Sequence, residues 1–117
     1  MIRMIACLRR KPGMSPEAFR RHWLHVHGPL IRGLPELTRH IRRYAQMHPA
    51  DLAMPADATG AEPWDGVAQM DFDSLEDLQR CFAEPSYLAH VRPDEESFLD
   101  LARCSVLLVD EHVMWER

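Results

Sequence analysis

The order of two hydrophobic periodicities along the chain constrains its fold more than any other feature. Apolar and polar side chains alternate in three segments, and a fourth is apolar on both faces; these patterns predict strands at residues 2–10, 38–48, 64–73 and 104–115. Helical spacing fills two of the intervals between them. The order is therefore strand, helix, strand, strand, helix, strand. In a single domain over residues 1–117 this order is most simply an α+β fold, the ferredoxin-like βαββαβ arrangement of an antiparallel sheet with helices on one face.

The boundaries of the two predicted helices follow from capping residues and prolines. The first begins after Ser15 and runs to about His27, where Pro29 is expected to end or kink it. The second covers residues 74–84, and residues 86–101 are expected to form short helical turns. Residues 49–63 are rich in Pro, Ala and Asp, which predicts a long loop whose role the sequence leaves open.

The last predicted strand is apolar on both of its faces. Cys104, Val106 and Leu108 share one face, and Leu107 and Val109 share the other. In the ferredoxin-like topology this strand lies at a sheet edge, where exposed apolar faces favour aggregation. A second copy of the chain covering the open face of the sheet would remove that hazard, so we expect a homodimer.

Composition excludes several classes of function. The net charge is −4 and the arginines are scattered, so nucleic acid is not an expected partner. No apolar run approaches the roughly 20 residues of a membrane span, so no membrane partner is expected either. The three cysteines include no C-x-x-C pair, which indicates reduced thiols and a cytoplasmic protein. The sequence has no G-x-G-x-x-G or phosphate loop, and no cofactor is expected.

Three histidines lie within the segment HWLHVHGPL, residues 22–30. His22 and His25 lack the nearby acidic residue of a helical zinc motif, so we predict no metal site and a solvated helix face. His27 lies at the margin of the predicted apolar stripe formed by Phe19, Trp23, Val26 and Leu30. From spacing alone, His27 is either a proton-transfer group at a pocket edge or a helix-end residue that bonds a free carbonyl.

Four motifs in the same order resemble the EthD family of the dimeric α/β-barrel superfamily. They are H-G-P-L after an aromatic residue, R-x-Y-x-Q in the second strand, D-G-V-A-x-x-x-F in the third, and a late D-E-x-x-F. The resemblance implies that two ferredoxin-like monomers pair through their sheets into a dimeric α/β barrel, with a pocket between each sheet and its helices. Fungal relatives are described as decarboxylases of aromatic polyketide acids. Other superfamily members isomerise muconolactones, cyclise polyketides or perform cofactor-free oxygenation, and the family often carries an oxidoreductase label.

The resemblance also suggests roles for individual residues. His27 matches the family's motif histidine, and Tyr44 and Gln46 match the second-strand motif, where they could be polar pocket groups. Asp94 and Phe98 match the late motif. Asp94 could orient a histidine or cap the turn it begins. Trp23 and Phe98 could contact substrate or belong to the core.

The expected function is acid/base chemistry on a small hydrophobic organic acid, lactone or ketone in catabolism or secondary metabolism. The reaction would be a decarboxylation, isomerisation or cyclisation, with His27 moving the proton and Tyr44 bonding the developing oxyanion. We therefore expect an enzyme of the lyase or isomerase type. The alternative is a non-catalytic accessory or binding protein of a monooxygenase system for xenobiotic degradation. Haem-assisted oxygenation is a third option. The sequence does not identify the substrate.

Overall fold

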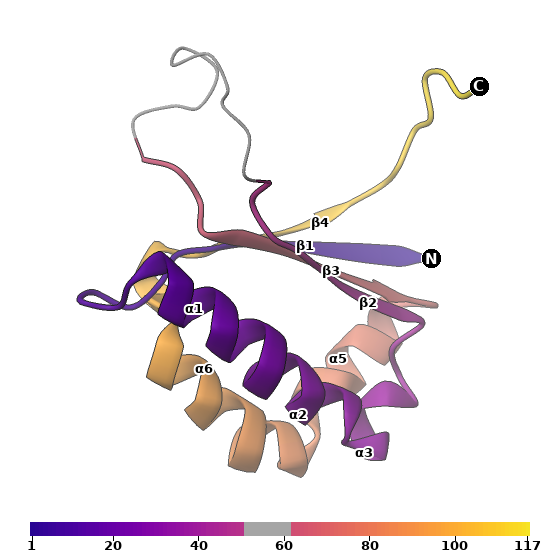
Figure 1. Cartoon of the computed structure of the whole chain (residues 1–117). Coiled ribbons are helices and arrows are strands. Elements are labelled where there is room, and N and C mark those ends of the chain that lie inside the picture. The colour runs from indigo at the N-terminus through magenta and orange to yellow at the C-terminus, as the bar shows by residue number, and fades with distance from the viewer. Residues whose placement is uncertain (51–61) are drawn as a thin grey trace.

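A four-stranded antiparallel sheet carries the helices on one of its faces (Figure 1). The structure is a computed structural model that describes residues 1–50 and 62–117. The strands are β1 (Ile2–Leu8), β2 (Arg43–Met47), β3 (Gly66–Phe72) and β4 (Ser105–Val109). The helical elements are α1 (Pro16–His22), η1 (Trp23–His27), α2 (Gly28–Arg32), α3 (Pro35–Thr38), α5 (Leu75–Ala83), η2 (Tyr87–Val91), α6 (Arg92–Phe98) and η3 (Leu101–Arg103). The loop predicted at 49–63 falls largely outside the described residues.

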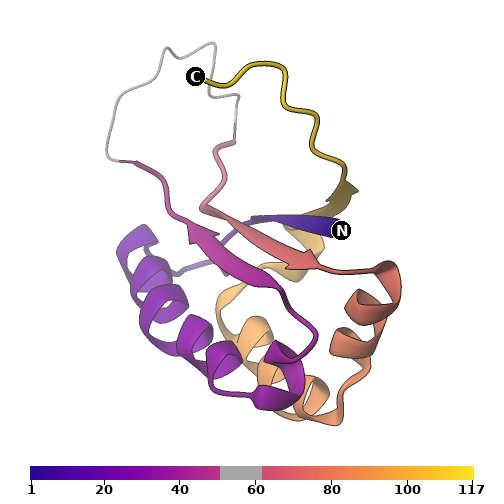
Figure 2. The same cartoon turned by 90° about the vertical axis from the view of Figure 1, so that its right-hand side faces the viewer.

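The strand order in the sheet is β2-β3-β1-β4, with antiparallel pairing throughout. Figure 2 views this sheet from the side of β2. Together with the helices that follow β1 and β3, this order is the ferredoxin-like βαββαβ fold. The predicted fold class is confirmed, as is the position of the last strand at a sheet edge.

Strand register determines which side chains face the helices. Met4 pairs with Met70 and Ala6 with Ala68, and both pairs face the helices. Tyr44 pairs with Met70, so the same face of β2 carries Tyr44 and Gln46. The sequence could not show which face of the second strand meets the pocket; the register shows that it is this one.

The opposite face of the sheet is open and carries an ion-pair chain. The Arg3 guanidinium contacts Asp71 Oδ1 through Nε at 2.9 Å and Glu111 Oε1 through Nη1 at 2.9 Å. The hydrogen bond donated by Arg3 lowers the pKa of Asp71, whose carboxylate is buried. Ile5 and Leu107 pair with each other beside these ion pairs, on the same open face of the sheet.

The last strand is shorter than predicted. β4 ends at Val109, and residues 110–117 have no regular secondary structure. This tail extends away from the helical layer (Figure 1) and exposes 91% of Met114 and 77% of Trp115. The prediction extended the strand through residue 115, but no strand in the described chain pairs with residues 110–115.

The first helix continues through Pro29, so of the two predicted effects of this proline, the end of the helix near His27 is wrong. In η1 the backbone widens to a π-helix, and the Gly28 N–H bonds to the carbonyl of Trp23, five residues earlier. A proline in a regular α-helix meets the carbonyl four residues before it. The wider π turn relieves that contact, which accounts for the continuation into α2.

The same π turn changes which residues are buried. Phe19, Trp23, His27 and Ile31 form the buried stripe, with uniform spacing of four residues. Val26, predicted to be buried, is exposed, and His27 moves from the margin into the stripe. The prediction assumed 3.6 residues per turn, which the π segment does not follow.

Candidate active site

Asp94 joins two histidines of the first helix. Its Oδ1 lies 2.9 Å from His22 Nε2, and its Oδ2 lies 2.8 Å from His27 Nδ1. The carboxylate comes from α6 and the histidines from α1 and η1, so this contact ties together helices from the two halves of the fold. The Phe98 ring packs against both imidazoles, with centroids 4.7 Å from His22 and 4.9 Å from His27.

This geometry determines the tautomers of both rings. An ionised carboxylate only accepts hydrogen bonds, so each ring nitrogen that faces Asp94 must donate. His22 therefore carries a proton on Nε2, and His27 carries one on Nδ1. In neutral His27 the lone pair is then on Nε2. Among the described residues, the structure gives that nitrogen no hydrogen-bond partner.

His27 lies at the wall of a small cavity between the sheet and the helices. The His27 residue is only 5% exposed to solvent. The cavity has a volume of about 70 Å³, and most of its lining is apolar. Four polar residues from four different elements also line it: His27, Tyr44, Tyr87 and Glu95. A polar group aimed at an apolar enclosure is a common arrangement in ligand and active sites.

Tyr87 and Glu95 form a hydrogen-bonded pair at this cavity. The Tyr87 hydroxyl donates to Glu95 Oε1 at 2.7 Å, and Arg92 Nη1 lies 3.6 Å from the same oxygen. Burial, followed by the charge of Glu95, raises the pKa of Tyr87 well above its usual range. Tyr87 therefore remains a hydrogen-bond donor to Glu95 at neutral pH.

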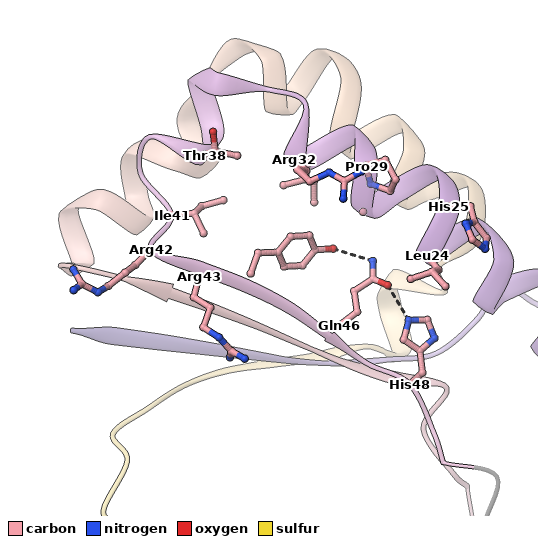
Figure 3. A pocket seen from close by; sticks show the side chains of 13 residues that line it. Leu24, His25, Pro29, Arg32, Thr38, Ile41, Arg42, Arg43, Gln46 and His48 are labelled. Carbon is pink, nitrogen blue, oxygen red and sulfur yellow. Dashed lines mark hydrogen bonds between the residues drawn. The ribbon is translucent and has the colours of Figure 1, made fainter.

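A larger groove of about 690 Å³ opens beside β2 and α2. It shares Tyr44 and Ile31 with the small cavity, so these two residues form a common wall. Figure 3 shows Arg32 over the groove, whereas Arg42 and Arg43 point away from its centre. The groove's lining contains no Asp or Glu among the described residues, which makes it suited to neutral or anionic ligands.

Gln46 organises the common wall. Its Nε2 donates to the Trp23 carbonyl at 2.8 Å and to the Tyr44 hydroxyl at 3.3 Å. Its Oε1 lies 2.8 Å from His48 Nε2 (Figure 3). Burial raises the pKa of Tyr44, whereas burial lowers the pKa of His48. At neutral pH Tyr44 is thus a protonated phenol that can donate a hydrogen bond.

The structure brings together the six predicted site residues. His27, Tyr44, Trp23 and Phe98 line the small cavity, Gln46 lines the groove, and Asp94 holds His27 from behind. Trp23 and Phe98 are also fully buried in the core. Of the two roles considered for Asp94, its side chain adopts the one that orients a histidine.

Sequence reasoning missed three residues of this site. His22 was assigned to a solvated face, but it bonds Asp94, 72 positions away. Tyr87 and Glu95 were not singled out at all. A usable signal was present, because an aromatic residue precedes a proline by six positions in both helices: Trp23 before Pro29, and Tyr87 before Pro93. Each aromatic begins a π segment, and such segments often occur at functional sites.

The described residues offer neither a metal site nor a membrane span. Within 1–50 and 62–117, no group of three or more His, Cys, Asp and Glu side chains is arranged to hold a metal ion. None of the helices in that part of the chain has the length and apolar character needed to cross a bilayer.

Comparison with known proteins gives consistent results. Residues 11–102 match the EthD domain. A decarboxylase of Claviceps purpurea is 34% identical over 104 residues, covering 83% of this chain and 73% of that protein. A conidial pigment biosynthesis dehydratase, EthD, of Metarhizium robertsii is 31% identical over 106 residues, covering 85% of this chain and 74% of that protein.

Solved structures show the same fold. An ethyl tert-butyl ether degradation (EthD) family protein from Bacillus halodurans superimposes with a TM-score of 0.68 at 20% identity, covering 96% of this chain and 99% of that one. A dimeric protein with a ferredoxin-like fold from Bacteroides fragilis gives a TM-score of 0.66 at 14% identity, covering 94% and 95%. From the domain match and the two related sequences, we conclude that this chain belongs to the EthD family.

Proposed function

We propose that this protein is an acid/base enzyme acting on a small, largely apolar organic acid, lactone or ketone, without a cofactor. One observation carries the proposal: His27 is buried, held by Asp94 through Nδ1, and lines an apolar cavity. A histidine oriented by a carboxylate is a common arrangement for moving protons near neutral pH. The related decarboxylases and dehydratases support a reaction in which a proton is moved to or from carbon or a leaving oxygen.

Tyr44 would stabilise negative charge during the reaction. Tyr44 lines the same cavity as His27, and its hydroxyl stays protonated because burial raises its pKa. A fixed donor of this kind stabilises an oxygen that becomes negative in the transition state. Gln46 Nε2 donates a hydrogen bond to this hydroxyl, which would keep Tyr44 in place.

The apolar body of the substrate would lie in the groove. The small cavity has room only for the reacting atoms, whereas the groove is nearly ten times larger and shares the Tyr44 wall with it. Displacement of Tyr44 would join the two spaces. Trp23 and Phe98 would border the reacting end of the substrate without leaving the core.

The test compares His27→Gln with a matched control, His90→Gln. His90 is exposed on η2 and lines neither the groove nor the small cavity. Two probes report on the reaction: an ortho-hydroxynaphthoic acid that gives naphthol on losing carbon dioxide, and a β-hydroxytetralone that gives naphthol on losing water. We expect His27→Gln to lower kcat at least about 100-fold and His90→Gln to leave it unchanged.

Two outcomes would contradict this assignment. A His27→Gln variant that retains the wild-type rate would remove His27 from the mechanism. If the wild-type protein and the His27→Gln variant bind naphthol equally well, and the wild-type protein turns over neither probe, a non-catalytic accessory protein would be favoured.

We also infer that two copies associate through the open face of the sheet. Leu107 is 48% exposed there, beside Ile5 and near the Arg3–Asp71 ion pair. The ferredoxin-like relative from Bacteroides fragilis is itself dimeric. Light scattering should give twice the 13.6 kDa of the chain, and Leu107→Asp should give a monomer. Leu88→Asp, on the helical side, is the control; a monomeric wild-type protein would refute the inference.

The compartment is a further expectation. The three cysteines form no disulfide, which fits a reducing environment such as the cytoplasm.

A further inference from the structure

Glu95 is a second ionisable group at the cavity that His27 lines. It follows Asp94 directly in α6, yet the two carboxylates have different surroundings. Asp94 bonds His22 and His27, whereas Glu95 lines the cavity itself. Residues one apart on a helix point in directions about 100° apart, which accounts for the division.

Tyr87 and Arg92 hold Glu95 by one oxygen only. Both the Tyr87 hydroxyl, at 2.7 Å, and Arg92 Nη1, at 3.6 Å, contact Oε1. Among the described residues, Oε2 has no hydrogen-bond or ion-pair partner. A carboxylate anchored by one oxygen keeps the other available to a ligand.

The two π segments present corresponding groups to this cavity. His27 is the last residue of η1, and Tyr87 is the first residue of η2. One segment supplies a histidine backed by Asp94, and the other supplies a tyrosine that holds Glu95. The cavity therefore contains two separately oriented groups that can exchange protons.

We propose that Glu95 is a second proton-transfer residue of this site, paired with His27, as an elimination of water from a β-hydroxy ketone would need. The proposal rests on the proposed acid/base function of His27 and adds the residue that such a reaction requires besides it. Decarboxylation requires one proton delivered to carbon. Elimination of water requires one group that removes a proton from carbon and another that protonates the departing oxygen.

Elimination of water would use Glu95 as the base and His27 as the acid. The Glu95 carboxylate takes the proton from the carbon between the carbonyl and the carbinol carbon, and Tyr44 donates a hydrogen bond to the carbonyl oxygen as it becomes negative. The electrons of the C–H bond form the carbon–carbon double bond. The C–O bond breaks, and its oxygen takes a proton from protonated His27 and leaves as water. Glu95 then holds one proton more and His27 one fewer, and exchange through solvent restores both.

The experiment uses Glu95→Gln and its neighbour Glu96→Gln in the full chain, with the two naphthol-releasing probes. Glu96 is exposed on the same helix and lies outside the cavity lining, so it is the matched control. For the β-hydroxytetralone we expect Glu95→Gln to lower kcat about 100-fold with little change in KM. Decarboxylation of the hydroxynaphthoic acid should fall much less than dehydration, because it needs only one proton delivered to carbon.

Tyr87→Phe tests the positioning role of the tyrosine. Without the donated hydrogen bond, Oε1 of Glu95 loses the 2.7 Å contact that holds it, so kcat for the tetralone should fall while KM stays close to the wild-type value. A purely structural role for Tyr87 would raise KM and lower Tm together with kcat.

The failure of this proposal can be told apart from failure of the proposed function. If Glu95→Gln dehydrates the tetralone at the wild-type rate while His27→Gln does not, the role of Glu95 is wrong and that of His27 stands. If wild-type protein decarboxylates the acid but never dehydrates the tetralone, the assigned reaction is wrong. If His27→Gln retains both activities, the proposed function of His27 is wrong, and the role of Glu95 that rests on it is wrong as well.

Discussion

Replacement of Asp94 by Asn tests how the site is held together. The carboxylate accepts from His22 Nε2 at 2.9 Å and from His27 Nδ1 at 2.8 Å, one bond on each oxygen. An amide has one oxygen and one NH₂ group, so it can accept from only one of the two rings. The other ring must give up its bond or change tautomer. If that ring is His27, its Nε2 gains a proton and can no longer accept one.

The expected loss of stability follows from those two hydrogen bonds. A hydrogen bond to a charged group contributes about 1.5–3 kcal/mol, and Asp94→Asn removes at least one of them. We expect unfolding free energy to fall by about 2 kcal/mol and Tm by about 10 °C. Loss of the orienting carboxylate should also lower kcat on the naphthol-releasing probes by roughly 10²–10⁴.

Thermal unfolding followed by circular dichroism and naphthol fluorescence measures both effects. Asp73→Asn is the matched control, because Asp73 pairs with exposed Arg42 and surface pairs add little stability. An Asp94→Asn protein with the Tm and the kcat of the Asp73→Asn protein would refute the reasoning.

Three further predictions follow from other contacts. His22→Gln should keep most of the activity, within about tenfold, because the bond from His27 to Asp94 remains; a loss as large as that of Asp94→Asn would show that His22 has a direct role. Gly66→Ala should lower the unfolding free energy by about 1–3 kcal/mol, since a Cβ there would lie 2.7 Å from Trp23 Cη2, and an unchanged denaturant midpoint would contradict this packing. The pKa of Asp71 is lower in the folded protein than its unfolded value near 3.8, so the ionised carboxylate stabilises the fold above that value, and this contribution is lost as pH falls through the folded pKa. Urea unfolding of Asp71→Asn between about pH 5 and 2 should therefore depend less on pH than that of the wild type. Identical pH dependence would contradict the assigned ion pair.

The existence and order of the strands were predictable because their signal is local. Alternation in β1 and β3 reports which side chains face the helices, as Met4 and Met70 do. The ends of strands were less predictable: β2 begins at Arg43 and not at residue 38, and residues 110–117 have no neighbouring strand in the described chain. Periodicity identifies an extended segment, whereas pairing depends on what lies beside it.

The site was only partly predictable, because its decisive contacts are distant in sequence. His27 and Tyr44 were found from the resemblance to the EthD family, and the structure places both at one cavity. The burial of His27 depends on the π turn of η1, which an ideal helical wheel cannot show. Glu95 could not be recognised from the sequence, because its contact with Tyr87 and its place at the cavity depend on how α6 packs against η2 and the sheet.

The orientation of His27, in which Asp94 holds Nδ1–H and Nε2 exchanges protons with the cavity, is tested most directly by nitrogen-15 NMR of the imidazole rings, with and without naphthol. We expect neutral His27 to carry its proton on Nδ1 and the Nε2 resonance to move when naphthol binds. A neutral His27 ring that carries its proton on Nε2, with resonances that do not respond to naphthol, would contradict this orientation.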